Sequence, residues 1–302
     1  MTRREFLPSA SVLTVAASAF GFSTKNAMNQ NFSMHYAPHF GMFKHSAGED
    51  LMDQLNFAAD QGFTAWEDNG MKGRSTQTQE RIADTMAKRN MQMGVFVAHT
   101  IFWNEPSLAS GDDQHREQFL KEIEESVEVA KRVNATWMTV VPGFVDLRAD
   151  MEYQTAHVIE SLRRASDILE PHGLVMAIEP LNPVNHPGLF LSEIPHAYQI
   201  CRSVNSPACK ILNDLYHQQI TEGNLIPNID ASWDEIVYFQ IGDNPGRKEP
   251  TTGEINFTNV FSHIREKGFK GILGMEHGNM HPGAEGEQAL IEAYRTVDGH
   301  KG

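Results

Sequence analysis

Short apolar runs alternate along the chain with longer segments in which apolar residues recur at helical spacing. The apolar runs lie at residues 33–43, 64–66, 91–98, 136–141, 175–178, 211–212, 236–239 and 272–275. The helix-like segments lie at residues 51–61, 78–89, 117–133, 155–172, 193–204, 233–235 and 257–267. Strands that alternate with helices are typical of a barrel of parallel strands. The pattern therefore predicts an α/β fold, a TIM (β/α)8 barrel.

Glycines support these boundaries, because Gly173 and Gly268 each follow a predicted helix, where helices often end in a left-handed residue. The main competing fold is a doubly wound open sheet, which a glycine-rich phosphate loop after the first strand would favour. The sequence has no such loop there. Residues 31–302 are the usual length of one barrel, and we expect them to form a single domain.

Oxygen-bearing side chains stand at the downstream ends of four predicted strands. They are Glu179, Asp214, Gln240 and Glu276, separated by 35, 26 and 36 positions. The downstream ends of parallel strands open on the same mouth of a barrel, so these side chains should converge. Three carboxylates and an amide would suit a hard divalent cation such as Mg²⁺, Mn²⁺ or Ca²⁺. The alternative is four unrelated buried polar residues, each satisfied by hydrogen bonds.

Several stretches resemble the hydroxypyruvate isomerase family of xylose isomerase-like barrels. They are Glu179-Pro-Leu-Asn182, Asp214-Leu-Tyr-His217, Glu222-Gly-Asn224 and residues 240–254. The resemblance implies a divalent metal, Mg²⁺ or Mn²⁺, held by Glu179, Asp214, Gln240 and Glu276. It also implies that Glu179 and Glu276 act as acid and base.

Four further residues are candidates for substrate binding. His217, which we expect in a loop beyond Asp214, corresponds in the resembling families to a histidine that hydrogen-bonds a substrate oxygen. Arg247 could bind a carboxylate through two hydrogen bonds. Glu67 ends the second predicted strand and His99 ends the third, so both could line the mouth. The simpler interpretations of His217 and Arg247 are a solvated loop histidine and a surface arginine.

These residues suit an isomerase that interconverts a small hydroxy-oxo acid, of the hydroxypyruvate to tartronate semialdehyde type, through an enediolate. Two carboxylates can remove and return the proton while a cation stabilises the developing charge. Two alternatives stay open: an epimerase or isomerase of a larger sugar or cyclitol, and a non-catalytic metal-containing sugar-binding barrel.

Charge narrows the choice of partners. The formal net charge of −14 argues against a nucleic-acid partner, and it also disfavours a metal-dependent endonuclease on a similar barrel. We expect a small-molecule partner, a hydroxy-oxo acid or a sugar, while the number of subunits stays open.

The first 30 residues have the features of an export signal. Arg3 and Arg4 precede Phe6-Leu7 and an apolar run at residues 11–22, which resembles a twin-arginine signal. That run is too short for a convincing membrane span, so we expect none in the mature protein. The sequence thus predicts an exported, periplasmic protein.

Overall fold

The computed structural model describes residues 32–299, so the predicted export signal lies outside the described part of the chain. The strands are β1 His35–Ala37, β2 Ala65–Trp66, β3 Gln92–Met93, β4 Trp137–Val140, β5 Val175–Ile178, β6 Cys209–Asp214, β7 Ile236–Gln240 and β8 Ile272–Gly274. Each strand falls within or overlaps one of the eight predicted apolar runs.

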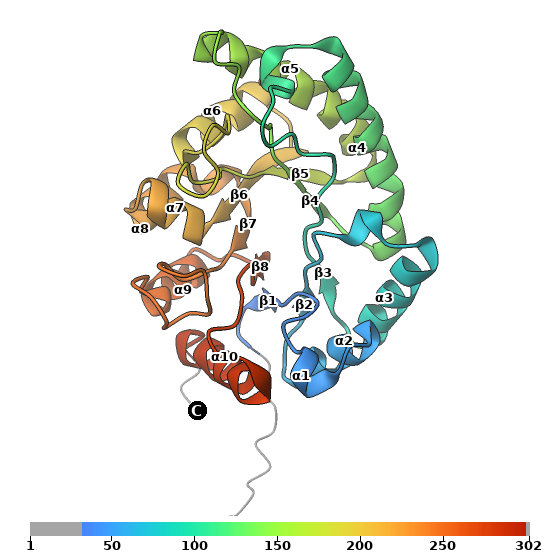
Figure 1. Ribbon diagram of the computed structural model, residues 1–302, viewed down its shortest axis with the longest axis vertical. Coiled ribbons are helices and arrows are strands. Elements are labelled where there is room, and N and C mark those ends of the chain that lie inside the picture. Colours follow the sequence, from blue (N-terminus) through green and yellow to red (C-terminus); the bar gives the residue numbers. More distant parts are fainter. Residues whose placement is uncertain (1–31, 300–302) are drawn as a thin grey trace, which may run out of the picture.

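The helices lie outside the ring of strands (Figure 1). They are α1 Lys44–Ala47, α2 Leu51–Asp60, α3 Thr76–Lys88, α4 Asp113–Val133, α5 Met151–Leu169, α6 Ile194–Val204, α7 Leu215–Thr221, α8 Leu225–Ser232, α9 Phe257–Glu266 and α10 Gly283–Val297. Four short 3-10 turns are η1 Met71–Gly73, η2 Leu108–Ser110, η3 Glu170–His172 and η4 Trp233–Glu235. Within residues 32–299, none of the helices combines the length and hydrophobicity needed to cross a membrane.

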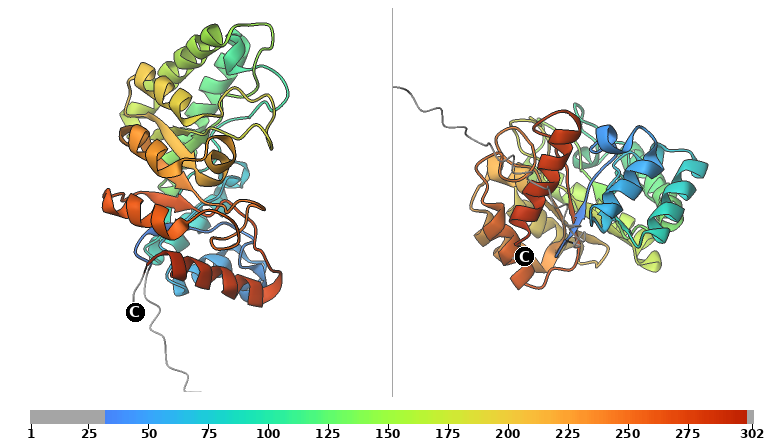
Figure 2. Two further views of the ribbon diagram at one scale, coloured as in Figure 1. Left: turned by 90° about the vertical axis from the view of Figure 1, so that its left-hand side faces the viewer. Right: turned by 90° about the horizontal axis from the view of Figure 1, so that it is seen from below.

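The strands pair in parallel around a barrel, which confirms the predicted fold. One sheet has the order β1-β8-β7-β6-β5-β4, and β2 pairs with β3 in a second. Backbone hydrogen bonds close the gaps between the sheets. On one side the Glu67 N–H donates to the Pro38 carbonyl at 2.9 Å, and on the other the Thr139 N–H donates to the Phe96 carbonyl at 2.8 Å and the Ala98 N–H to the Thr139 carbonyl at 3.1 Å. The long irregular loops gather on one side of the molecule (Figure 2).

Two glycines inside the barrel leave space for the polar ends of two large side chains. A cluster separate from the main core contains a buried residue from each of six strands together with one that follows β3: Ala37, Ala65, Val95, Ala177, Leu212, Tyr238 and Ile272. A Cβ atom on Gly94 would lie 2.4 Å from the Tyr238 hydroxyl, and one on Gly274 would lie 1.9 Å from Glu67 Oε2. Glycine at these two positions therefore leaves the space that Tyr238 and Glu67 occupy.

Most predicted helices are present, but the segment after Asp214 differs from the prediction. We expected a loop there, whereas α7 begins directly at Leu215 and α8 follows it; the predicted helix near residues 233–235 is present as the short 3-10 turn η4. The reason is that the Asp214 side chain caps α7, since Oδ1 accepts hydrogen bonds from the Tyr216 and His217 N–H groups. Helices α1 and α10 were also missed.

The loop between β7 and α9 is organised by one buried carboxylate. Asp243 is inaccessible to solvent and accepts hydrogen bonds from three backbone N–H groups, those of Asn244 at 2.9 Å, Gly253 at 2.8 Å and Ile255 at 3.1 Å. The loop in turn carries Arg247, whose backbone has a positive φ of 50°. Asp243 therefore determines where Arg247 enters the mouth of the barrel.

Replacing Asp243 by alanine should lower the free energy of unfolding by on the order of 3 kcal/mol, because three buried N–H groups lose their acceptor. Urea denaturation measures this. Asp234→Ala is the matched control, since the Asp234 side chain is 56% exposed and its ion pair with Arg202 lies at the surface. The control should change stability by no more than about 0.5 kcal/mol. Equal effects of the two substitutions would contradict the role given to Asp243.

Candidate active site

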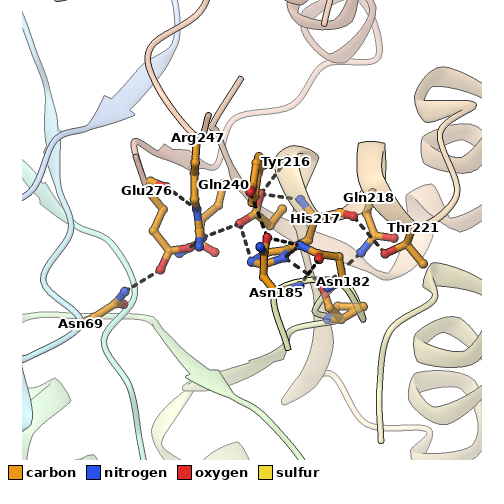
Figure 3. A network of polar contacts seen from close by, with 12 residues as sticks. Asn69, Asn182, Asn185, Tyr216, His217, Gln218, Thr221, Gln240, Arg247 and Glu276 are labelled. Atoms are coloured by element: carbon orange, nitrogen blue, oxygen red, sulfur yellow. Dashed lines mark hydrogen bonds and ion pairs between the residues drawn. The ribbon is translucent and has the colours of Figure 1, made fainter. Parts of the chain in front are cut away.

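Four oxygen-bearing side chains lie at the ends of adjacent strands, as the sequence predicts. Glu179 directly follows β5, Asp214 and Gln240 end β6 and β7 in register with each other, and Glu276 lies two residues beyond β8. Ligand atoms of Glu179, Asp214 and His217 come within 4.8 Å of one another. Arg247 links Asp214 with Glu276 by hydrogen bonds of 3.2 and 2.7 Å to their carboxylates (Figure 3).

The site concentrates negative charge away from water. Glu67, Glu179 and Asp214 are buried, and the Glu276 side chain is 27% exposed. Burial, and then the charge of Glu276, raise the pKa of Glu67 to about 8 and the pKa of Glu179 well above its usual range. Burial and the nearby Asp214 raise the pKa of Glu276 to about 7, although Arg247 opposes this. A positive charge among these groups is therefore strongly favoured.

Arg247 provides one such charge. Its guanidinium contacts Asp214 and Glu276, its Nε donates to the Glu276 carbonyl at 3.0 Å, and it lies over the Tyr216 ring at 5.0 Å. These carboxylates raise the pKa of Arg247. With 30% of its side chain exposed, Arg247 faces the mouth. Its predicted role in binding a substrate carboxylate stays a prediction, because here it pairs with the protein's own carboxylates.

Glu67 lies deeper than a residue that lines the mouth. The residue is 2% exposed, and its carboxylate accepts hydrogen bonds from the Tyr238 hydroxyl at 2.7 Å and from Gln240 Nε2 at 2.9 Å. Because the nitrogen end of the Gln240 amide faces Glu67, its oxygen Oε1 faces the other way. Glu67 therefore orients Gln240, a contact that sequence analysis did not foresee.

The two histidines proposed for substrate binding occupy different surroundings. His217 lies on α7 and is fully buried beside Asp214, and burial lowers its pKa to about 4. His99 Nε2 accepts a hydrogen bond from the Val141 N–H at 3.3 Å, and its ring packs edge-on against Phe119. Burial lowers the pKa of His99 to about 4 as well. His217 thus lies beside the group of acids, whereas His99 contacts Val141, directly after β4, and Phe119 on α4.

Asparagines complete the site, and sequence analysis gave them no role. Asn69, from the loop after β2, donates to Glu276 Oε1 at 3.0 Å from the side opposite Arg247 (Figure 3). Asn182 contacts His217. Asn182 stands in the Glu-Pro-Leu-Asn stretch, so its position could have been suspected, but the sequence around Asn69 carries no comparable signal.

The residues fit a divalent cation. Glu179, Asp214, Glu276 and Gln240 offer the hard oxygen donors that Mg²⁺ and Mn²⁺ prefer. Gln240 Oε1 is buried and has no hydrogen-bond partner within residues 32–299, which is costly for a polar atom unless a ligand satisfies it. The raised pKa values of Glu179 and Glu276 indicate that burial and the neighbouring acids disfavour their ionised forms, and a bound cation would stabilise those forms.

Comparison with known proteins identifies the same fold. The profile of a family described as "Xylose isomerase-like TIM barrel" matches residues 55–297. A crystal structure described as an AP endonuclease, family 2, from Brucella melitensis is 25% identical, with a TM-score of 0.75, and covers 86% of this chain and 99% of its own.

Two curated relatives are similar in sequence. A hydroxypyruvate isomerase of Escherichia coli is 30% identical over 161 residues, which is 53% of this chain and 62% of that protein. A 2-oxo-tetronate isomerase of Pectobacterium atrosepticum is 27% identical over 234 residues, 75% of this chain and 86% of that protein. The chain spans about three-fifths of the length of the relatives from E. coli and Xenopus laevis that it matches.

The raised carboxyl pKa values predict how the stability of the metal-free protein depends on pH. A carboxyl whose pKa is higher in the folded state stabilises the fold at low pH, and this contribution disappears as pH rises through the folded value. From about pH 5 to about pH 8, chelator-treated protein should therefore lose on the order of 2 kcal/mol. Urea unfolding at several pH values measures this.

Glu67→Gln should flatten the dependence of stability on pH, whereas Glu128→Gln, on the exposed face of α4, should leave that dependence unchanged. A flat profile for the unaltered protein would contradict the prediction.

Adding Mn²⁺ or Mg²⁺ should reverse this trend, because the cation binds deprotonated carboxylates. The rise in Tm on adding either ion should be larger at pH 8 than at pH 6. Asp214→Asn should reduce that rise, and Asp234→Asn serves as the exposed control. A Tm that does not respond to either ion at pH 8 would count against the metal site.

Proposed function

Because the chain belongs to the xylose isomerase-like TIM barrel family, we propose that it is a divalent-metal-dependent isomerase of a small hydroxy-oxo acid of the hydroxypyruvate type. The observation that carries this proposal is the set of four oxygen donors at the ends of β5 to β8, in which Glu179 and Glu276 have raised pKa values. The names of the relatives, a hydroxypyruvate isomerase and a 2-oxo-tetronate isomerase, support the substrate class.

The reaction moves a carbonyl group to the neighbouring carbon. A proton leaves the hydroxyl-bearing carbon beside the carbonyl and an enediolate forms. A proton is then added to the former carbonyl carbon, and the hydroxyl proton passes to the former carbonyl oxygen. A bound Mg²⁺ or Mn²⁺ would stabilise the negative charge that develops on the substrate oxygens. Residues that exchange these protons work best when their pKa lies near the working pH.

Glu179 and Glu276 suit that exchange. They follow the fifth and eighth strands, so they approach the mouth from separated positions in the barrel. The pKa of Glu276, about 7, allows it to hold or release a proton near neutral pH. Asn69 and Arg247 hold the two oxygens of the Glu276 carboxylate at 3.0 and 2.7 Å, which fixes its direction.

His217 and Arg247 serve the substrate's oxygens in this proposal. The buried Nε2 of His217 faces the group of acids and makes no hydrogen bond with residues 32–299. Arg247 could pair with the substrate carboxylate in place of Glu276, since it already reaches the mouth from the Asp243 loop. Such an exchange would free Glu276 to act on the substrate.

We also propose that the protein is exported through the twin-arginine segment at residues 1–30. The basis is Arg3-Arg4 followed by Phe6-Leu7 and the short apolar run. Fractionation of cells that express the full chain, with Arg3→Lys and Arg4→Lys together as the control, tests this location.

Entry of solvent deuterium into the substrate tests the isomerase. In deuterated water with Mn²⁺, hydroxypyruvate or a related hydroxy-oxo acid should gain deuterium beside its carbonyl, as followed by NMR. Glu179→Gln and Glu276→Gln should each lower the rate by at least on the order of 10²-fold, because each removes a proton-transfer group. Glu128→Gln, which changes an exposed glutamate in the same way, should leave it unaltered.

Other outcomes would replace the proposal. Exchange only with ketoses or cyclitols would identify an epimerase or isomerase of larger sugars. Metal binding without exchange in any of these compounds would favour a binding protein. Metal-dependent cleavage of DNA at abasic sites would instead indicate an endonuclease, the activity named for the B. melitensis structure.

A further inference from the structure

We infer that Asn182 is a positioning residue that keeps the proton of the His217 ring on Nε2, so that His217 is a hydrogen-bond donor in the site. Its significance for catalysis rests on the proposed function. Hydrogen bonds alone fix which ring nitrogen carries the proton. The position of that proton decides whether His217 can bind a metal or donates a hydrogen bond to the substrate.

Two nitrogens of Asn182 point at one nitrogen of the histidine. Asn182 lies three residues after Glu179 and is inaccessible to solvent. Its side-chain Nδ2 is 2.6 Å from His217 Nδ1, and its backbone N–H donates to the same Nδ1 at 3.2 Å. Both groups are donors, so Nδ1 must accept.

The orientation of the Asn182 amide is fixed by its other contacts. Its Oδ1 accepts hydrogen bonds from the backbone N–H groups of Val184 at 3.1 Å and Asn185 at 2.8 Å. Its Nδ2 donates to Asn185 Oδ1 at 3.0 Å, and the Tyr216 hydroxyl donates to that same oxygen at 2.9 Å. A flipped amide would place oxygen against oxygen at Asn185 and nitrogen against two N–H donors. Figure 3 shows this group beside His217.

The proton of a neutral imidazole must then reside on Nε2. Nε2 is buried, lies 3.5 Å from Asp214 Oδ2, and makes no hydrogen bond within the described chain. A nitrogen that carries a proton has no lone pair to offer a cation. His217 is therefore excluded as a metal ligand through Nε2, although its ring lies close to Glu179 and Asp214. Instead it presents an N–H group to an oxygen of a bound substrate, which suits a group that becomes negatively charged.

The tautomer can be read directly from the ¹⁵N and ¹H NMR spectrum of the histidine rings of the metal-free protein. His217→Gln identifies the His217 signals among the 14 histidines. The unaltered protein should show a protonated Nε2 and an unprotonated Nδ1. A proton on Nδ1, or on both nitrogens, at pH 7 would overturn the inference.

Asn182→Asp reverses the interaction in a side chain of the same shape. A carboxylate oxygen in place of Nδ2 only accepts, so a proton should appear on His217 Nδ1, and where the ring stays neutral Nε2 loses its own. Asn185→Asp is the matched control. It adds the same charge to the same loop, keeps the acceptor for Asn182 Nδ2 and Tyr216, and should leave the His217 tautomer unchanged. A tautomer unaffected by Asn182→Asp in folded protein would overturn the inference.

Kinetics then separate this inference from the proposed function. Loss of the Nε2 donor in Asn182→Asp should lower kcat/KM for deuterium exchange by on the order of 10²-fold relative to Asn185→Asp. If the spectra agree with expectation but the unaltered protein exchanges no deuterium, the proposed function fails and the role of Asn182 stands. If exchange occurs while Nδ1 carries the proton, the role of Asn182 fails and the function stands. The spectrum of the unaltered protein decides the question even if Asn182→Asp does not fold.

Discussion

The mutual repulsion of carboxylates at the mouth of the barrel and just beneath it is the constraint on which the rest of the site depends. Glu67, Glu179, Asp214 and Glu276 lie close enough for the charge of one to raise the pKa of another. Such an arrangement persists only where positive charge and hydrogen-bond donors compensate for it. Arg247, Asn69, Tyr238 and Gln240 all contribute donors. The Gln240 oxygen that has no partner in the described chain marks where a cation would complete the balance.

The barrel makes this arrangement possible through small residues in its interior. Gly94 and Gly274 leave space for the Tyr238 hydroxyl and the Glu67 carboxylate, which lie where a larger side chain would otherwise pack. Glu67 in turn directs the Gln240 amide. Two hydrogen bonds, from Tyr238 and from Gln240 to Glu67, therefore connect the packing of the barrel interior with a candidate ligand at its mouth.

Arg247 and His217 are each positioned by another residue that does not itself face the substrate in the proposed reaction. Asp243 holds the loop that carries Arg247, and Asn182 holds His217. Asp214 also has two functions, since it caps α7 with one oxygen and contacts Arg247 with the other. Substitutions of these supporting residues would change the direction of a side chain without removing it from the site.

The alternation of apolar runs and amphipathic segments was enough to predict the barrel and to place Glu179, Asp214, Gln240 and Glu276 at one mouth, because parallel strands end at the same side.

Strand periodicity could not reveal α7, because Asp214 both ends a strand and caps a helix. Nor could it find Asn69, whose partner Glu276 is 207 positions away. The protonation of His217 and the direction of the Gln240 amide depend on contacts with Asn182 and Glu67 that lie on other strands or loops. Sequence determined which chemical groups reach the mouth, and only the tertiary structure decided which atoms face one another, because hydrogen-bond direction is a property of neighbours in space.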